Sequence, residues 1–63
     1  MNFYEIIGKG NHCHWINLKS IIFVEFDDDF KEIIFDGMIR IMMEEKDYAK
    51  TRKKLLKAMF KLP

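Results

Sequence analysis

The sequence has little of what usually holds a small protein together. Its 63 residues include a single cysteine, Cys13, so no disulfide can form within the chain. A lone cysteine is typical of a reducing compartment, and no paired clusters of zinc ligands are present. A chain this short buries only ~60% of the surface that it exposes when unfolded. We therefore expect very efficient packing or self-association to stabilise it.

Long apolar runs and targeting signals are also missing. The apolar stretches are far shorter than the ~20 residues of a membrane-spanning helix. Residues 1–5 lack the basic start and the apolar run of a signal peptide. The only proline, Pro63, ends the chain and constrains no element. We expect a single cytoplasmic domain over residues 1–63.

What the chain does contain is apolar bulk and divided charge. Hydrophobic residues make up 49% of it and include six Phe and five Met, which argues against disorder. The net charge of +1 hides an asymmetry. Residues 1–47 hold ten acids and five bases, whereas residues 48–63 hold six bases and no acid. The sequence therefore predicts an acidic body and a basic C-terminal segment.

Aromatic and β-branched residues in short runs predict strands, most strongly over residues 21–26. Gly8–Asn11 is a predicted loop, Asp27–Asp29 breaks a strand, and Asp36-Gly37 is the signal of a two-residue type I′ hairpin. Asn17–Ser20 is a predicted corner. We expect an antiparallel meander of four to five strands, at about residues 2–7, 12–17, 21–27, 32–36 and 38–43.

From about Glu45 the apolar period changes from 2 to 3.6, which predicts a helix over about residues 45–61. Acids lie at its start and bases in its middle and end, as the helix dipole favours, and Asp47 is a candidate N-cap. The fold class is therefore α+β, with the meander packed against one C-terminal helix. The predicted apolar stripe of the helix consists of Tyr48, Arg52, Leu55, Leu56, Met59 and Phe60.

Strand alternation divides the meander into two faces, and one helix covers only one of them. The covered face is predicted to hold Ile22, Val24, Phe26, Ile33, Phe35, Ile39, Ile41 and Met43. The predicted core is Trp15, Val24, Phe26, Ile33, Phe35, Ile39, Ile41, Leu55, Leu56 and Met59. The other face keeps an apolar strip, which predicts a homodimer or a docked protein. Its candidate contact residues are Ile21, Phe23, Ile34, Met38 and Met42, mixed with Glu25, Glu32 and Arg40.

A lysine stripe, formed by Lys50, Lys53, Lys54, Lys57 and Lys61, lies opposite the apolar stripe of the helix. One interpretation is the solvated face of an amphipathic helix. The alternative is a phosphate-binding surface for nucleic acid, with electrostatic and salt-sensitive affinity. Binding to a membrane surface is disfavoured, because the apolar side of the helix is needed to cover the sheet.

Two shorter motifs carry possible chemistry. Asp27, Asp28 and Asp29 form either a solvated hairpin turn or an acidic surface that attracts a basic partner. His12 and His14 share one face of a strand and flank Cys13, but a closed zinc site would need ligands from a second chain. We expect no metal, cofactor or catalytic residue.

The segments Trp15-Ile16-Asn17, Ile21, Val24-Glu25 and Asp36-Gly37 resemble the small flagellar family of FlbD-like, or swarming-motility, proteins. The resemblance spans about residues 15–45 without gaps. The usual proline after the asparagine is Leu18 here, and the C-terminal segment is more basic than in the family. The resemblance implies the strand meander and no catalytic residues.

The sequence as a whole predicts a small non-catalytic binding protein, a regulator or inhibitor that acts by protein–protein contact. Proteins of this kind are common among bacterial accessory and phage-encoded chains. One alternative is a nucleic-acid-binding protein that uses the lysine stripe. Another is a metal- or thiol-dependent activity at His12, Cys13 and His14.

Overall fold

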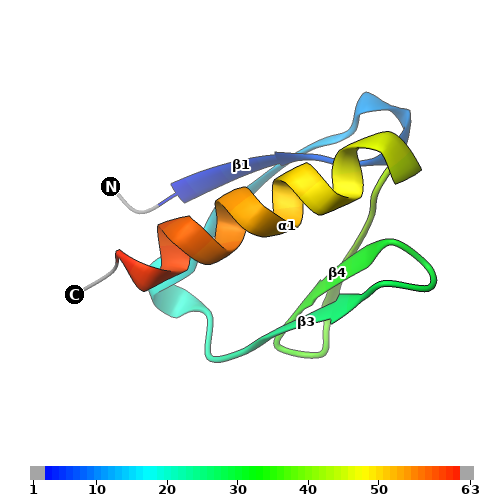
Figure 1. The fold of residues 1–63 in the computed structure, drawn as a ribbon. Helices are drawn as coiled ribbons and strands as arrows, with labels where there is room; N and C mark the ends of the chain where they lie inside the picture. Colours follow the sequence, from blue (N-terminus) through cyan, green and yellow to red (C-terminus); the bar gives the residue numbers. More distant parts are fainter. Residues whose placement is uncertain (1–2, 62–63) are drawn as a thin grey trace.

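A computed structural model describes residues 3–61 and shows five antiparallel strands and one C-terminal helix (Figure 1). The predicted α+β meander against a helix is confirmed, and its strands form two sheets. The predicted first residue of the first strand, Asn2, lies outside the described residues. The first sheet is a hairpin that pairs β1 (Phe3–Ile7) with β2 (Cys13–Asn17). The second sheet contains β3 (Val24–Asp27), β4 (Glu32–Phe35) and β5 (Ile39–Met42). The helix is α1 (Glu45–Phe60).

Helix α1 runs across both sheets, with the β1–β2 hairpin on one side of it and the three-stranded sheet on the other (Figure 1). The two strands of the hairpin join through a short 3-10 turn, Lys9–Asn11, and a second one, Leu18–Ser20, forms the predicted corner. The core lies where the hairpin, the three-stranded sheet and the helix meet. Its buried hydrophobic side chains are Ile6, Ile16, Leu18, Ile33, Phe35, Ile41, Met43, Tyr48 and Leu55.

The third strand begins at Val24, so the predicted strand over residues 21–27 is too long. For the two residues before Val24, the side-chain carboxylate of Asp36 takes the place of a neighbouring strand as the hydrogen-bond acceptor. Its Oδ1 accepts hydrogen bonds from the backbone N–H groups of Ile22 at 2.9 Å and Phe23 at 3.0 Å. A long-range contact therefore overrides the strand propensity of this apolar run.

The structure places a turn at Asp36-Gly37, as predicted. Both residues have a positive φ, 53° and 69°, as a type I′ turn requires. The loop is one residue longer than predicted, because Phe35 pairs with Ile39 and Met38 belongs to the turn. The predicted strand start at residue 38 is therefore wrong. The extra residue sets the register that brings Ile41 opposite Ile33 on the inner face.

Gly8 lies close to the three-stranded sheet. A Cβ atom on this residue would lie 2.9 Å from the backbone oxygen of Met42 and 3.0 Å from Cγ2 of Ile41. Real Cβ atoms essentially never lie under 3.0 Å from such an atom, so the contact with the Met42 oxygen could not form without a shift. Only glycine at this position lets the two sheets meet.

Four of the predicted core residues are fully buried, and three more pack partly against them. Trp15 and Ile39 are exceptions, with 63% and 42% of their surface exposed. Trp15 faces outward because its neighbours on β2, His14 and Ile16, turn toward the core. The buried residues are Ile33, Phe35, Ile41 and Leu55, the partly buried ones are Val24, Phe26 and Met59, and Leu56 is half-buried.

Three other face assignments are also wrong. Ile22 and Phe60 were predicted to face the core, but they are 88% and 86% exposed. Ile21, assigned to the uncovered face, packs against the core instead. Residues 21 and 22 lie outside any strand, so the alternation on which their assignment depended does not hold there. The N-cap of α1 is Glu44 and not Asp47, which lies in the first turn.

Candidate functional site

The outer face of the β1–β2 hairpin is largely apolar. Phe3 and Ile7 on β1 are each 51% exposed, and Trp15 stands beside them on β2. Cys13 pairs with Ile7, and Glu5 pairs with Trp15 at the centre of the face. This surface was missed by sequence reasoning because Trp15 was assigned to the core. The alternation of His14 and Ile16 with Trp15 was the signal that could have revealed it.

Cys13 is exposed, and its thiol donates a hydrogen bond to Oε2 of Glu5 at 2.8 Å. This carboxylate raises the pKa of the Cys13 thiol, because it holds the proton and repels a thiolate. The thiolate is the reactive form of cysteine. The environment therefore disfavours a nucleophilic role for Cys13.

The histidines that flank Cys13 are placed differently from the thiol. His14 and Cys13 point to opposite faces of β2, as predicted, and His12 lies in the turn before the strand. Within residues 3–61, no three His, Cys, Asp or Glu side chains gather closely enough to hold a metal ion.

The outer face of the three-stranded sheet contains most of the predicted contact residues. Ile34 pairs with Arg40, and Met42 pairs with Glu32, so these four side chains share this face. Phe23 lies just before β3, at the Asp36-Gly37 end of this sheet, where its carbonyl accepts the N–H of Asp36 at 3.0 Å. We define the outer sheet face as the strand residues Ile34, Met42, Glu25, Glu32 and Arg40, together with Phe23 and Met38 at the Asp36-Gly37 end of the sheet. Ile21 is not part of it.

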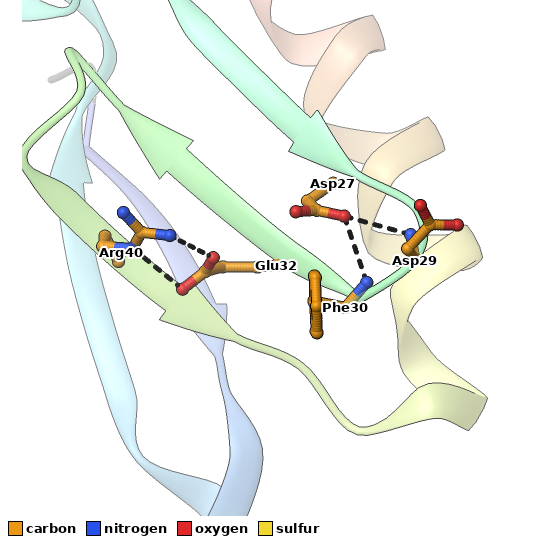
Figure 2. Close-up of polar contacts among 5 residues, drawn as sticks. All are labelled: Asp27, Asp29, Phe30, Glu32 and Arg40. Carbon is orange, nitrogen blue, oxygen red and sulfur yellow. Dashed lines mark hydrogen bonds and ion pairs between the residues drawn. The ribbon is translucent and has the colours of Figure 1, made fainter.

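An ion pair lies on this outer sheet face (Figure 2). The guanidinium of Arg40 donates to both carboxylate oxygens of Glu32, at 2.9 and 3.2 Å. Glu32 is 8% exposed, while the side chain of Arg40 is 61% exposed. A two-bonded pair of this kind has a defined geometry, so Arg40 is held in place as a fixed charge on the surface.

The acidic turn at Asp27–Asp29 stabilises the β3–β4 hairpin. Oδ1 of Asp27 accepts hydrogen bonds from the backbone N–H groups of Asp29 and Phe30, each at 3.1 Å (Figure 2). Aspartate commonly closes a turn in this way. Asp28 and Asp29 are exposed, so the turn also presents negative charge.

Asp28 connects the helix to this turn through a hydrogen bond and an ion pair. Its Oδ1 accepts a hydrogen bond of 2.5 Å from the hydroxyl of Tyr48, a buried residue of α1. The same oxygen lies 3.8 Å from Nε of Arg52, whose guanidinium covers the ring of Phe26 at 5.0 Å from its centroid. These contacts explain why an arginine lies on the apolar stripe of the helix.

The burial of Tyr48 predicts a loss of stability at alkaline pH. Burial, together with the hydrogen bond to Asp28, raises the pKa of Tyr48 from 10.0 to about 12. The folded protein keeps the phenol protonated, so its contribution to stability is complete below pH 10 and falls as the pH rises toward 12. We expect the melting temperature to fall more steeply over this range in the wild type than in Tyr48→Phe. Parallel curves for the two proteins would contradict this.

The lysine stripe faces solvent. Its five members are all exposed, and none of the ion pairs found among residues 3–61 involves them. Lys50 and Lys54 border a hollow of about 380 Å³ between α1 and β1, whose other wall includes Tyr4 and Asn11. Asp47 and Glu5 also line this hollow, so its charge is mixed.

No protein-family model matches this chain, and no curated protein or solved structure is significantly similar to it. The resemblance to the FlbD-like family therefore stays a prediction. Over residues 3–61, no helix is long and apolar enough to cross a membrane.

Proposed function

We propose that this chain is a non-catalytic binding protein, a regulator or inhibitor that acts by contact between its outer sheet face and the surface of another folded protein. The partner is expected to cover Phe23 and Met42 with apolar side chains. It is also expected to place an acidic group near Arg40, which Glu32 holds in a fixed position. Fixed charges beside apolar anchors are typical of specific interfaces.

The observation that carries the proposal is the amount of apolar surface left exposed. Among residues 3–61, nine hydrophobic side chains are buried, whereas ten large ones are exposed. The accessible surface is 4741 Å², compared with about 4300 Å² expected for a compact monomer of this mass. Exposed apolar surface in clusters usually marks a contact with another molecule.

Phe23→Asp tests the proposal. Phe23 is 48% exposed and its backbone bonds to Asp36 do not involve the side chain, so the variant is expected to fold. Loss of an aromatic anchor from an interface costs about 2 kcal/mol, or about 30-fold in affinity. A partner captured from the native host by the tagged wild type, and identified by mass spectrometry, is expected to bind the variant at least about 30-fold more weakly in titrations.

Phe30→Asp is the matched control. Phe30 is 73% exposed but belongs to the β3–β4 turn and not to the outer sheet face, so the same chemical change there should leave the partner's affinity unchanged. A partner that binds both variants as tightly as the wild type would exclude the outer sheet face. An equal loss of affinity in both variants would indicate that the partner binds near the acidic turn at Asp27–Asp29 instead.

The exposed and unpaired lysine stripe favours a second candidate function, the binding of nucleic acid phosphates. Such binding depends on salt, because counterions are released from the nucleic acid. If this function is correct, retention on a DNA column should fall steeply with salt and be abolished in the double variant Lys53→Glu, Lys57→Glu. The same double variant should keep the affinity for a protein that binds the outer sheet face.

A further inference from the structure

The free edge of β2 is a surface that neither of these functions uses. Among residues 3–61, strand β2 pairs with β1 and with no other strand. The N–H of Gly8 donates to the carbonyl of His12 at 2.7 Å, which fixes the alternation of the ladder. His14 and Ile16 consequently direct their backbone groups toward β1. Cys13, Trp15 and Asn17 direct theirs toward the open edge.

This edge carries none of the features that normally prevent a strand from pairing with another chain. Charged residues, prolines and bulges protect exposed edges, and Cys13–Asn17 contains no Asp, Glu, Lys, Arg or proline. The other strands differ in this respect. Glu5 lies in the middle of β1, β3 contains Glu25 and Asp27, and β5 contains Arg40.

We infer that β2 pairs edge to edge with β2 of a second copy of the chain, antiparallel and centred on Trp15, to form a four-stranded sheet. This inference does not depend on the proposed function, because it uses backbone groups of β2 and not the outer sheet face. An antiparallel pair of identical strands has twofold symmetry, the commonest symmetry of protein oligomers. The pairing joins Trp15 to its symmetry mate and places Cys13 opposite Asn17.

Three physical arguments favour a second copy as the occupant. The β1–β2 sheet has only two strands and depends on packing against the rest of the core, and the pairing would widen it to four strands. Self-pairing of β2 brings no like charges together, whereas self-pairing of β1 about its centre would place Glu5 opposite Glu5. The Trp15 pair also adds an aromatic cross-strand contact and covers part of a side chain that is 63% exposed.

Cys13→Pro and Cys13→Ser form the test pair. Proline at position 13 removes an N–H that points away from β1 and places ring carbons in the path of the second strand. His12 already has the extended backbone that a residue before proline prefers, with φ −71° and ψ 124°. Sedimentation equilibrium should show a dimer of about twice 7.6 kDa for the wild type and Cys13→Ser. In Cys13→Pro the dissociation constant should rise at least about 100-fold.

A second measurement needs no variant and therefore does not depend on Cys13→Pro being folded. In concentrated wild-type protein the Trp15 amide should exchange with deuterium at least about 100-fold more slowly than in dilute protein. The Glu5 and Ile7 amides, which point to the open edge of β1, should exchange at the same rate at both concentrations. They serve as internal controls on the same hairpin.

Several results would overturn the inference. They are a wild type that stays monomeric at millimolar concentration, equal dimerisation of the two Cys13 variants, and a Trp15 amide that exchanges as fast as that of Glu5. Ile7→Asp changes the outer face of the hairpin and leaves the β2 edge intact, so it should still dimerise. If Ile7→Asp stays monomeric, the dimer forms through the outer face of the hairpin and not through the β2 edge. Phe23→Asp should also dimerise, which separates this test from that of the proposed function.

Discussion

Phe35→Ala is expected to leave little folded protein at 25 °C. Phe35 is the largest of the fully buried side chains and lies on β4, the central strand of the three-stranded sheet. Replacing a buried phenylalanine by alanine costs about 3–5 kcal/mol, because the lost contacts leave a cavity. A single core in a chain of this size contributes about 3–5 kcal/mol in total. The change therefore removes most of the stability of the fold.

The measurement is urea denaturation followed by circular dichroism, with Phe30→Ala as the control. Phe30 is also a phenylalanine, but it is 73% exposed in the turn after β3, and substitutions at such positions change stability by about 0.5 kcal/mol or less. Phe35→Ala should lack the unfolding transition that Phe30→Ala retains. Similar transitions in the two variants would show that Phe35 is not at the centre of the core.

Gly8→Ala is expected to destabilise the protein by about 1–3 kcal/mol, the usual effect of overpacking. The backbone of Gly8 is extended, with φ −87° and ψ −171°, a conformation open to any residue. The substitution would normally stabilise by about 0.4–1 kcal/mol, because alanine has less freedom in the unfolded chain. The sign is reversed here because the new Cβ would lie 2.9 Å from the Met42 backbone oxygen.

Thermal melting of Gly8→Ala beside Lys9→Ala checks this expectation. Lys9 is the next residue and is exposed, so its truncation should leave the melting temperature nearly unchanged. A melting temperature for Gly8→Ala at or above that of the wild type would mean that the two sheets can move apart without loss. The contact would then play no part in holding them together.

Within the predicted contact surface, strand alternation placed side chains correctly only for residues that lie in regular strands. Ile34, Arg40 and Met42 share the outer sheet face as predicted, because all three lie in regular strands where alternation holds. Ile21 and Ile22 do not follow the pattern, because Asp36 captures the backbone of residues 22 and 23. No pattern in the neighbourhood of Ile21 contains information about a carboxylate so far along the chain.

For Trp15 the local pattern was predicted correctly, but its burial was not. Its strand and its face relative to Ile16 were predicted correctly, but which face of the hairpin meets the core depends on where the other sheet lies. Large aromatic side chains are usually buried, and that general rule failed for this one. Trp15 is consequently left on the outer face of the hairpin, with 63% of its surface exposed.

The sequence by itself determined the order and type of the elements, because strand alternation, the Asp36-Gly37 turn and the 3.6-residue period of the helix are local properties of the chain. It also determined the separation of an acidic body from a basic helix face. The tertiary structure alone decided that the strands form two sheets, that Gly8 is their meeting point and that Asp28 fastens Tyr48. These features depend on contacts between residues far apart in the chain, which local periodicity does not encode.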